Sequence, residues 1–526
     1  MLKTTSFSSS HAFTYLALAG LLLWILALFL QMTNFASSDL GRHVMNGQVI
    51  TESGQVFQNN LYSYTNGEFP APNHHWLFGL VVYWIHQMGG FPLVTVAIAV
   101  IYLAAIASTV FFSSKLSSIQ TSGAVTLLFL PIIGMRVETR PEAFSVLGLS
   151  IILILCHQLW TKKHFATRLF LIGFSSLVML LWVNVHILFV LGLIVSVSYA
   201  VVAVFSKSTR RVFDYLLLIC VQIIAALCNP LGWKTILYPL QILRDYQYPV
   251  AENKSIFFFM RYHPSASYAY LLLVLLVVAI TIVLTYKRVA IRYRPIWLVC
   301  SVLIVLTAAM NRFSSFFYIP GILVVSITLH QLRQTRTYAR FFSQDWLGQP
   351  AKAIAVTCVI TGLIGFMFLT HTLNPFKQSF GLGMYPDAEL AGAFFKNNQL
   401  PGPVFNNYDI GGYLIYTLYP YQKVFVDNRP EAYQGTFMTE KYIAAQKDES
   451  VWQQLETEYE FNTIFFYRHD ATDWAMPFLI RRIEDDSWTP VYVDAFSLIL
   501  LKNRAENQEK IDQFQLPRSM FSISKV

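Results

Sequence analysis

The sequence has little charge for its length. Only 13% of its 526 residues are Asp, Glu, Lys or Arg, whereas 55% are hydrophobic. A soluble chain carries about 25% charged residues, and apolar runs long enough to cross ~30 Å of hydrocarbon recur through residues 1–371. The composition excludes an ordinary soluble protein and predicts a membrane protein with several spans.

Cysteine is also scarce. The chain has 5 cysteines, each inside an apolar run and none in residues 372–526. This placement excludes a disulfide framework and a cysteine zinc site, and it is typical of small buried hydrophobic residues.

The sequence lacks the short motifs of soluble enzymes. There is no GxGxxG after a strand, no phosphate-binding P-loop, no GxSxG and no HExxH. The apolar runs are nearly free of acids and bases, which argues against ion transport.

The apolar runs predict eleven membrane spans. The first is longer than the apolar core of a signal peptide and has no small-residue cleavage site after it, so we expect it to be retained. The predicted spans are 11–31, 91–112, 123–135, 143–160, 169–183, 187–205, 212–228, 268–286, 296–310, 313–331 and 351–371.

Basic residues are distributed unevenly between the connections. Residues 1–371 hold 24 Lys and Arg against 9 Asp and Glu, whereas residues 372–526 hold 14 against 20. Alternate connections carry most of the basic excess, so the positive-inside rule places the N-terminus in the cytoplasm. We therefore expect a multi-pass protein of the inner (cytoplasmic) membrane with an extracytoplasmic C-terminal domain. The net positive charge reflects this topology and predicts no nucleic-acid partner.

The composition divides the chain at residue 371. Residues 1–371 form the predicted membrane domain, which includes the outer loops 32–90 and 229–267. In the first loop, 74–90 is expected to be an interfacial amphipathic helix, with a tilted transmembrane helix as the alternative. Residues 372–526 are expected to be a soluble α/β domain with a buried strand at KVFVD and further strands at PVFNN, NTIFFY, 491–494 and 496–501.

Polar turns follow three of the spans on the predicted outer side. A guanidinium at such a position can bind phosphate with two parallel hydrogen bonds. These turns predict a substrate-binding cavity, and interfacial headgroup anchoring or contacts between helices are the alternatives. The candidate residues are Arg136, Glu138, Arg140, Glu142, Asn184, His186 and Arg312.

The first outer loop begins directly after the first span and supplies Asp39, a carboxylate close to the membrane. Replacing a phosphate at a sugar carbon needs one base for the incoming hydroxyl, because phosphate is already a good leaving group. A helix cap is the alternative role of Asp39. The same loop adds Arg42, His43, His74 and His75, which are otherwise interfacial polar residues.

Several motifs resemble the GT-C glycosyltransferases, the multi-span membrane enzymes that use polyprenyl-phosphate sugars and include protein O-mannosyltransferases. The matching stretches are DLGRH from Asp39, GQVI from Gly47, Gly54, YSYT, NHHWL, TRPE, WVNVH, Asn229-Pro230, NYDIGGYL from Asn407 and VDNR. The resemblance implies a GT-C-like all-α membrane fold of about 11 transmembrane helices with an extracytoplasmic α/β domain.

By this resemblance the chain is an inverting glycosyltransferase and Asp39 is its catalytic residue. The donor would be a lipid-linked sugar and the acceptor a glycan, lipid or protein, with membrane lipids as further partners. His75 departs from the family pattern, which has Glu there, so a divalent metal stays open as a cofactor. Candidates in the C-terminal domain are Tyr408, Asp427, Arg429 and Glu431, for which a structural ion pair is the alternative.

Two other functions are consistent with the sequence. A transporter or flippase for lipid-linked sugars would need a continuous polar path, which the sparse charge of the spans does not favour. A non-catalytic membrane subunit with an exported binding domain would retain its function after Asp39, Arg140 and Arg312 are neutralised.

Overall fold

The computed structural model describes residues 9–244, 248–334 and 379–521. Their contacts divide the chain into two units. Unit 1 comprises Met1–Gln31, Thr95–Ile236 and Val250–Leu382, and unit 2 comprises Met32–Val94, Leu237–Pro249 and Gly383–Val526. The division at residue 371 drawn from composition differs from this grouping, because the first outer loop packs with the C-terminal part. The predicted span 351–371 lies outside the described residues.

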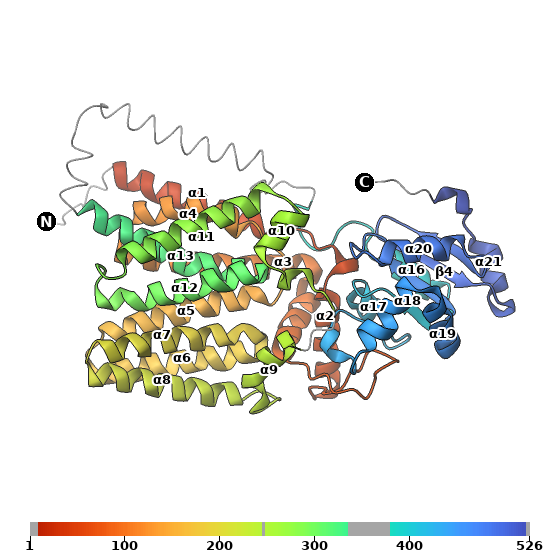
Figure 1. Ribbon diagram of the computed structural model, residues 1–526, viewed down its shortest axis with the longest axis horizontal. Coiled ribbons are helices and arrows are strands. Elements are labelled where there is room, and N and C mark those ends of the chain that lie inside the picture. The colour runs from red at the N-terminus through yellow and green to blue at the C-terminus, as the bar shows by residue number, and fades with distance from the viewer. Residues whose placement is uncertain (1–8, 245–247, 335–378, 522–526) are drawn as a thin grey trace. The chain divides into compact units, whose positions relative to one another are not determined.

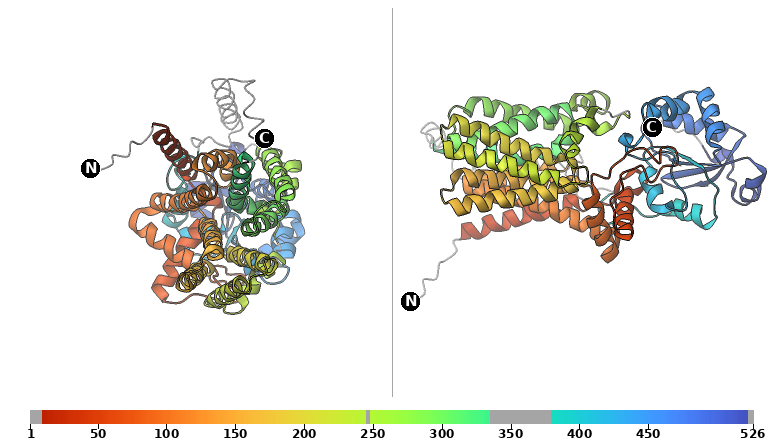
Figure 2. Two further views of the ribbon diagram at one scale, coloured as in Figure 1. Left: turned by 90° about the vertical axis from the view of Figure 1, so that its left-hand side faces the viewer. Right: turned by 90° about the horizontal axis from the view of Figure 1, so that it is seen from below.

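Unit 1 is helical. Its long helices α5, α6, α7, α8, α11, α12 and α13 run along one another as a bundle, which the left panel of Figure 2 shows nearly end-on (Figure 1). The helices are α1 (Ser9–Phe29), the later part of α3 (Trp76–Leu116), α4 (Ile119–Ile133), α5 (Glu142–Thr161), α6 (Phe165–Val185), α7 (Val190–Phe205), α8 (Thr209–Leu227), α10 (Ile256–Tyr262), α11 (Ala266–Thr285), α12 (Arg294–Ala309) and α13 (Ser314–Arg333).

Seven helical segments in the described part are long and apolar enough to cross a membrane, so the chain is a multi-pass membrane protein. They are Trp76–Leu116, Glu142–Thr161, Phe165–Val185, Ile187–Phe205, Ala266–Thr285, Ile291–Ala309 and Asn311–Arg333. Tyr15–Phe29 and Ile119–Ile133 are shorter apolar helices. The total of eleven spans stays a prediction, although helices occupy ten of the eleven predicted positions.

Small polar side chains join neighbouring helices of the bundle. Ser150 Oγ lies 2.8 Å from Thr109 Oγ1, which links α5 to α3. Gln222 on α8 accepts from Ser196 on α7 at 2.7 Å and donates to Ser175 on α6 at 2.9 Å. Such bonds satisfy polar groups that would otherwise face hydrocarbon, and they fix how the helices are rotated.

One helix differs from the sequence-based expectation and another agrees with it. The span predicted at 169–183 is part of a helix of 21 residues, α6, so it is not short. In α3 the backbone leaves helical geometry at Gly89 and at Gly90, where φ is +65°. The glycine pair therefore separates an N-terminal segment from the apolar segment that follows, as the sequence predicted, and residues up to Val94 belong to unit 2.

Unit 2 has a four-stranded sheet in the order β1-β2-β4-β3. Strands β1 (Val404–Asn406) and β2 (Thr463–Tyr467) are parallel, whereas β4 (Ser497–Lys502) runs antiparallel to β2 and to β3 (Trp488–Val493). The sequence predicted a helical membrane part and a C-terminal part with both helices and strands. The structure confirms that the chain is mostly helical with a small sheet near its C-terminus. The helices of this unit are α2 (Leu40–Ser53), α16 (Leu390–Asn397), α17 (Gly411–Leu418), α18 (Ala444–Lys447), α19 (Glu449–Tyr459), α20 (Ala475–Glu484) and α21 (Gln508–Phe514) (Figure 1). A π-helical turn, η7 (Phe437–Ile443), precedes α18, and α9 (Lys234–Arg244) ends within unit 2.

The KVFVD segment was expected to be a buried strand, and this prediction is wrong. Its only ladder pairing among the described residues is a single bridge between Val424 and Ser63 of the first loop. The Asn406 side chain instead accepts from Phe425 N at 2.9 Å and donates to Val426 O at 2.8 Å. The segment still lies beside β1, and Ser63 of the first loop pairs with it through that single bridge.

Candidate functional site

Asp39 begins helix α2, but its side chain makes no capping hydrogen bond to that helix. The carboxylate is 34% exposed and lies 3.9 Å from Nη2 of Arg42, one turn further along. Arg42 is buried, and its Nε donates to Oδ1 of Asn428 at 3.1 Å. Asp39 is therefore a partly exposed carboxylate beside a guanidinium that the C-terminal segment holds in place.

Three predicted histidines gather on one side of α2. The His43 and His75 rings are 5.6 Å apart, and the His74 and His75 rings are 3.9 Å apart. His74 also contacts Tyr238, with ring centroids 5.0 Å apart. His43 is fully enclosed and packs edge-on against Phe78.

Two aspartates follow the carboxyl ends of the parallel strands. Asp409 follows β1 and Asp470 follows β2, the edge at which open α/β sheets place ligands. Asn407, which directly follows β1, bonds to the end of β2: its Nδ2 donates to Asp470 at 2.8 Å and its Oδ1 accepts from Tyr467 N at 2.8 Å. Burial, and then the charges of Asp470 and Asp39, raise the pKa of Asp409 to about 7. We call Asp39, Asp409 and Asp470 the aspartate cluster.

Tyrosine rings lie near Asp409 and Asp470. Tyr248 stacks on Tyr408, with ring centroids 3.9 Å apart. Tyr408 in turn donates its backbone N–H to the Tyr442 hydroxyl at 2.7 Å. The Tyr248 hydroxyl is buried without a hydrogen-bond partner within the described residues, and burial, Tyr442 and the charges of Asp470 and Asp409 raise its pKa.

Asp427 and Arg429 form a buried two-bond ion pair, at 2.8 and 2.7 Å. Arg429 also donates to Asn60 of the first loop at 2.9 Å, and its guanidinium stacks over the Tyr62 ring. Burial raises the pKa of Glu431 nearby. These residues tie the first loop to the C-terminal part of unit 2, which is the structural alternative that the sequence left open.

In unit 1, three predicted arginines share one carboxylate. Arg136 lies at the end of α4, Arg140 before α5 and Arg312 between α12 and α13, and all three pair with Glu252. Burial alone would raise the pKa of Glu252, but these three charges hold it well below its usual range. We call the four residues the arginine cluster.

Glu138 and Glu142 border the arginine cluster. Glu138 is 58% exposed and accepts from Arg140 Nε at 2.6 Å, whereas Glu142 is buried and lies 3.6 Å from Arg136. The cluster and its two bordering glutamates together hold three cations and three anions, so their summed formal charge is zero.

Asn184 and His186 bond to neighbouring helices. Asn184 donates to Cys228 O at 3.1 Å and accepts from Asn229 at 3.1 Å, while His186 Nδ1 lies 2.7 Å from Ser145 Oγ. These bonds match the helix-contact alternative given for both residues.

No three His, Cys, Asp or Glu side chains in the described ranges converge so that they could hold a metal ion. The histidine group contacts through ring edges and faces rather than by aiming nitrogens at a common point. The residues present therefore do not form a ready metal site, and no chemical step is assigned to a metal.

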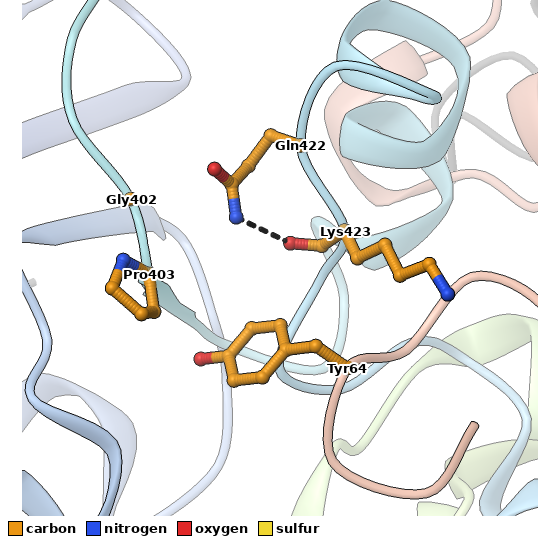
Figure 3. A pocket seen from close by; sticks show the side chains of 5 residues that line it. All are labelled: Tyr64, Gly402, Pro403, Gln422 and Lys423. Carbon is orange, nitrogen blue, oxygen red and sulfur yellow. Dashed lines mark hydrogen bonds between the residues drawn. The ribbon is translucent and has the colours of Figure 1, made fainter.

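An open pocket of about 460 Å³ lies elsewhere in unit 2. Figure 3 shows Tyr64 of the first loop facing Pro403 and Gly402, with Gln422 and Lys423 on the other side. Gln422 donates to the Lys423 carbonyl at 3.0 Å. None of the predicted site residues lines this pocket.

The sequence analysis named Asp39 and the three arginines but missed Glu252, Asp409 and Asp470 as site residues. Asp409 and Asp470 follow predicted strands that turn out to be parallel, and that position is a signal. No sequence pattern marked Glu252 as a site residue, because its partner Arg140 lies 112 residues away in the sequence.

A multi-pass helical bundle followed by an α/β unit, with an aspartate at the start of the first loop, is the architecture to compare with known proteins. No protein-family model and no curated protein matches this sequence. Solved structures do. The oligosaccharyltransferase of Archaeoglobus fulgidus, determined with a tethered acceptor peptide, matches with a TM-score of 0.58 at 10% identity over 94% of this chain and 74% of its own.

Two further structures match over most of this chain. ArnT from Cupriavidus metallidurans, determined with undecaprenyl phosphate, has a TM-score of 0.51 at 12% identity, covering 97% of this chain and 100% of ArnT. The arabinofuranosyltransferase AftD from Mycobacteria has a TM-score of 0.55 at 13% identity, covering 94% of this chain and 40% of AftD. The chain therefore has the GT-C fold of these membrane glycosyltransferases, which confirms the predicted fold family.

Proposed function

We propose that the protein is an inverting glycosyltransferase that moves a sugar from a polyprenyl-phosphate donor to an acceptor at the outer face of the inner membrane. The observation that carries this proposal is the state of Asp39. Its carboxylate is partly exposed at the start of the first loop and does not cap its own helix. The fold it shares with known glycosyltransferases supports the same reaction class.

Asp39 is the base of the proposed reaction. It takes the proton of the acceptor hydroxyl as the acceptor oxygen forms a bond to the anomeric carbon. The bond from that carbon to the phosphate oxygen breaks on the opposite side, and its electron pair leaves with the polyprenyl phosphate. The configuration at carbon therefore inverts. No second carboxylate has to act as an acid, because the phosphate leaves without protonation.

The arginine cluster binds the donor phosphate in this proposal. Its three guanidinium groups converge on one anion and offer fork-shaped donors that match phosphate oxygens. Arg42 and the histidines beside α2 border Asp39. Glu142 orients Arg136, and Asn184 and His186 support the bundle through their helix contacts, whereas Glu138 is an exposed partner of Arg140 outside the phosphate-binding group.

Unit 2 binds the acceptor in this proposal, which can be a glycan, lipid or protein. Asp409 and Asp470 offer hydrogen-bond acceptors at the strand ends, and tyrosine rings lie near them. The Archaeoglobus fulgidus enzyme has also been determined with zinc and sulfate. A divalent metal in this chain would need ligands beyond the aspartate and histidine groups described above.

The test is Asp39→Asn in purified protein with a labelled polyprenyl-phosphate sugar. Asn keeps the shape but cannot accept the proton, so transfer should fall by about 10²–10⁴, the usual contribution of a general base. Donor binding and the melting temperature should stay close to wild type. Retention of more than half the wild-type rate would refute Asp39 as the base.

A further inference from the structure

Glu252 occupies the centre of the arginine cluster. Its Oε1 lies 3.2 Å from Nη2 of Arg136 and also pairs with Arg140, while its Oε2 lies 3.3 Å from Nη2 of Arg312. The three arginines come from separate helix ends of the bundle, and each gives a guanidinium to the same two oxygens. This is the arrangement expected around a bound oxyanion.

The glutamate belongs to a connecting segment and not to the bundle helices. It lies in a single 3-10 turn, η3 (Ala251–Asn253), between α9 and α10. Asn311 N donates to Lys254 O at 2.9 Å, which fixes this turn beside Arg312. Glu252 is thus a carboxylate on a loop, whereas the arginines are anchored by the bundle.

The charges of the arginine cluster and its two bordering glutamates cancel while Glu252 is in place. The side chain is 18% exposed and ionised, because its pKa is held well below the usual range by the surrounding arginines. Together with Glu138 and Glu142 it balances the three arginines. An anion that binds beside this neutral group gains little electrostatic stabilisation. An anion that replaces Glu252 contacts three guanidinium groups.

We propose that Glu252 is a specificity-determining residue of the phosphate site, a built-in anion that a phosphate monoester displaces more readily than a phosphodiester, so that the site favours the developing and released polyprenyl phosphate. The inference rests on the proposed function of the arginine cluster. A carboxylate brings one negative charge, so a singly charged phosphodiester such as a phospholipid headgroup displaces it poorly. A terminal phosphate carries about −1.5 to −2 at pH 7 and three oxygens, so it displaces Glu252 readily.

The same property favours the bond-breaking step. A sugar-linked polyprenyl phosphate is a phosphodiester with one negative charge. When its sugar leaves, the electron pair of the broken bond stays on the phosphate and its charge approaches −2. The phosphate replaces Glu252 beside the arginines more favourably as this charge develops. The replacement therefore stabilises the transition state more than the ground state.

The experiment measures lipid binding by the full chain in detergent, without sugar or acceptor. The probes are undecaprenyl phosphate, inorganic phosphate and phosphatidylglycerol, and the variants are Glu252→Gln and Glu138→Gln. Glu252→Gln should bind undecaprenyl phosphate about tenfold more tightly, the worth of one charge-assisted bond, and inorganic phosphate more tightly as well. Phosphatidylglycerol should begin to compete.

Glu138→Gln is the matched control. It removes the same charge from Arg140, but Glu138 is exposed and does not occupy the shared position. Its affinity for undecaprenyl phosphate should change by less than about threefold, as expected for a solvent-screened pair. An equal gain in both variants would show a general charge effect and overturn the inference.

A second measurement uses the wild-type protein, in case Glu252→Gln does not fold. Undecaprenyl phosphate should speed hydrogen exchange in residues 250–262, because Glu252 leaves the arginines. Unchanged exchange at saturating lipid, or unchanged affinity in a folded Glu252→Gln variant, would overturn the inference. Failure of sugar transfer alongside tighter binding would count against the proposed function and leave Glu252 as a phosphate-selecting residue.

Discussion

Asp409 is a residue whose charge changes near neutral pH. Its carboxyl is buried beside Asp470 and Asp39, which raises its pKa from 3.8 to about 7. The unfolded chain releases this proton near the ordinary pKa, whereas the folded chain holds it up to about pH 7. The stability that the group contributes is therefore full below pH 4 and is lost as the pH rises through 7.

We expect Asp409→Asn to stabilise the protein at pH 8 and to change little at pH 4.5. The loss that the variant avoids is at most about 1.4 kcal/mol for each pH unit between the two pKa values. The melting temperature in detergent should therefore rise by roughly 2 °C or more at pH 8. A constant difference between the two melting temperatures from pH 4.5 to 8 would contradict the raised pKa. Asp486→Asn, an exposed position, serves as the control.

At this scale the sequence could identify residues but not their partners. Asp39 was recognisable because it begins a polar loop directly after a span. The arginines were recognisable because charge at a helix end is costly near a membrane. The pairing with Glu252 could not be predicted, since nothing in the spacing relates residue 252 to residues 136, 140 and 312.

Among the elements, α2 and the first part of α3 pack unusually closely. Gly47 and Gly79 face each other, so a methyl group on Gly47 would overlap the Gly79 carbonyl oxygen and the Tyr83 Cβ. Both overlaps involve backbone or the first side-chain atom, which cannot rotate away. The close approach sets the position of Asp39 and of the histidines, because both helices carry them.

We therefore expect Gly47→Ala to destabilise unit 2 by about 1–3 kcal/mol or more, the usual cost of overpacking. The measurement is the melting temperature together with the yield of monodisperse protein. Gly173→Ala in α6 is the matched control, because a methyl group there meets nothing within 4 Å. Comparable melting temperatures for wild type and Gly47→Ala would show that the two helices can separate without loss.

The elements also show where sequence patterns fail. The long apolar helices and the strands at NTIFFY and 496–501 were predictable, because the pattern of hydrophobic residues alone indicates each of these elements. KVFVD has the same buried composition, but its backbone groups bond to the amide side chain of Asn406 instead of a neighbouring strand. A side chain that substitutes for a strand leaves no trace in hydrophobic periodicity.

For the whole molecule, the distribution of basic residues predicts the topology. Lys207, Arg210 and Arg211 cluster around the start of α8, and Arg288, Arg292 and Arg294 cluster around the start of α12. We expect a reporter fused near Arg210 to be cytoplasmic and one fused after Val526 to be extracytoplasmic. The readout is alkaline phosphatase against green fluorescent protein activity. A cytoplasmic signal from the C-terminal fusion would remove the outer-face reaction.

The ties between the first loop and the C-terminal part have a consequence for biosynthesis. Ser63 bonds to a carbonyl 362 residues later in the chain, so at about 5–20 residues per second its partner is made roughly 20–70 s afterwards. During that interval the bundle can insert into a membrane while the first loop lacks its partner in the C-terminal part. Ribosome stalling before residue 424 would leave an inserted chain whose first loop is exposed to proteases, because the segment that it packs against has not yet been made.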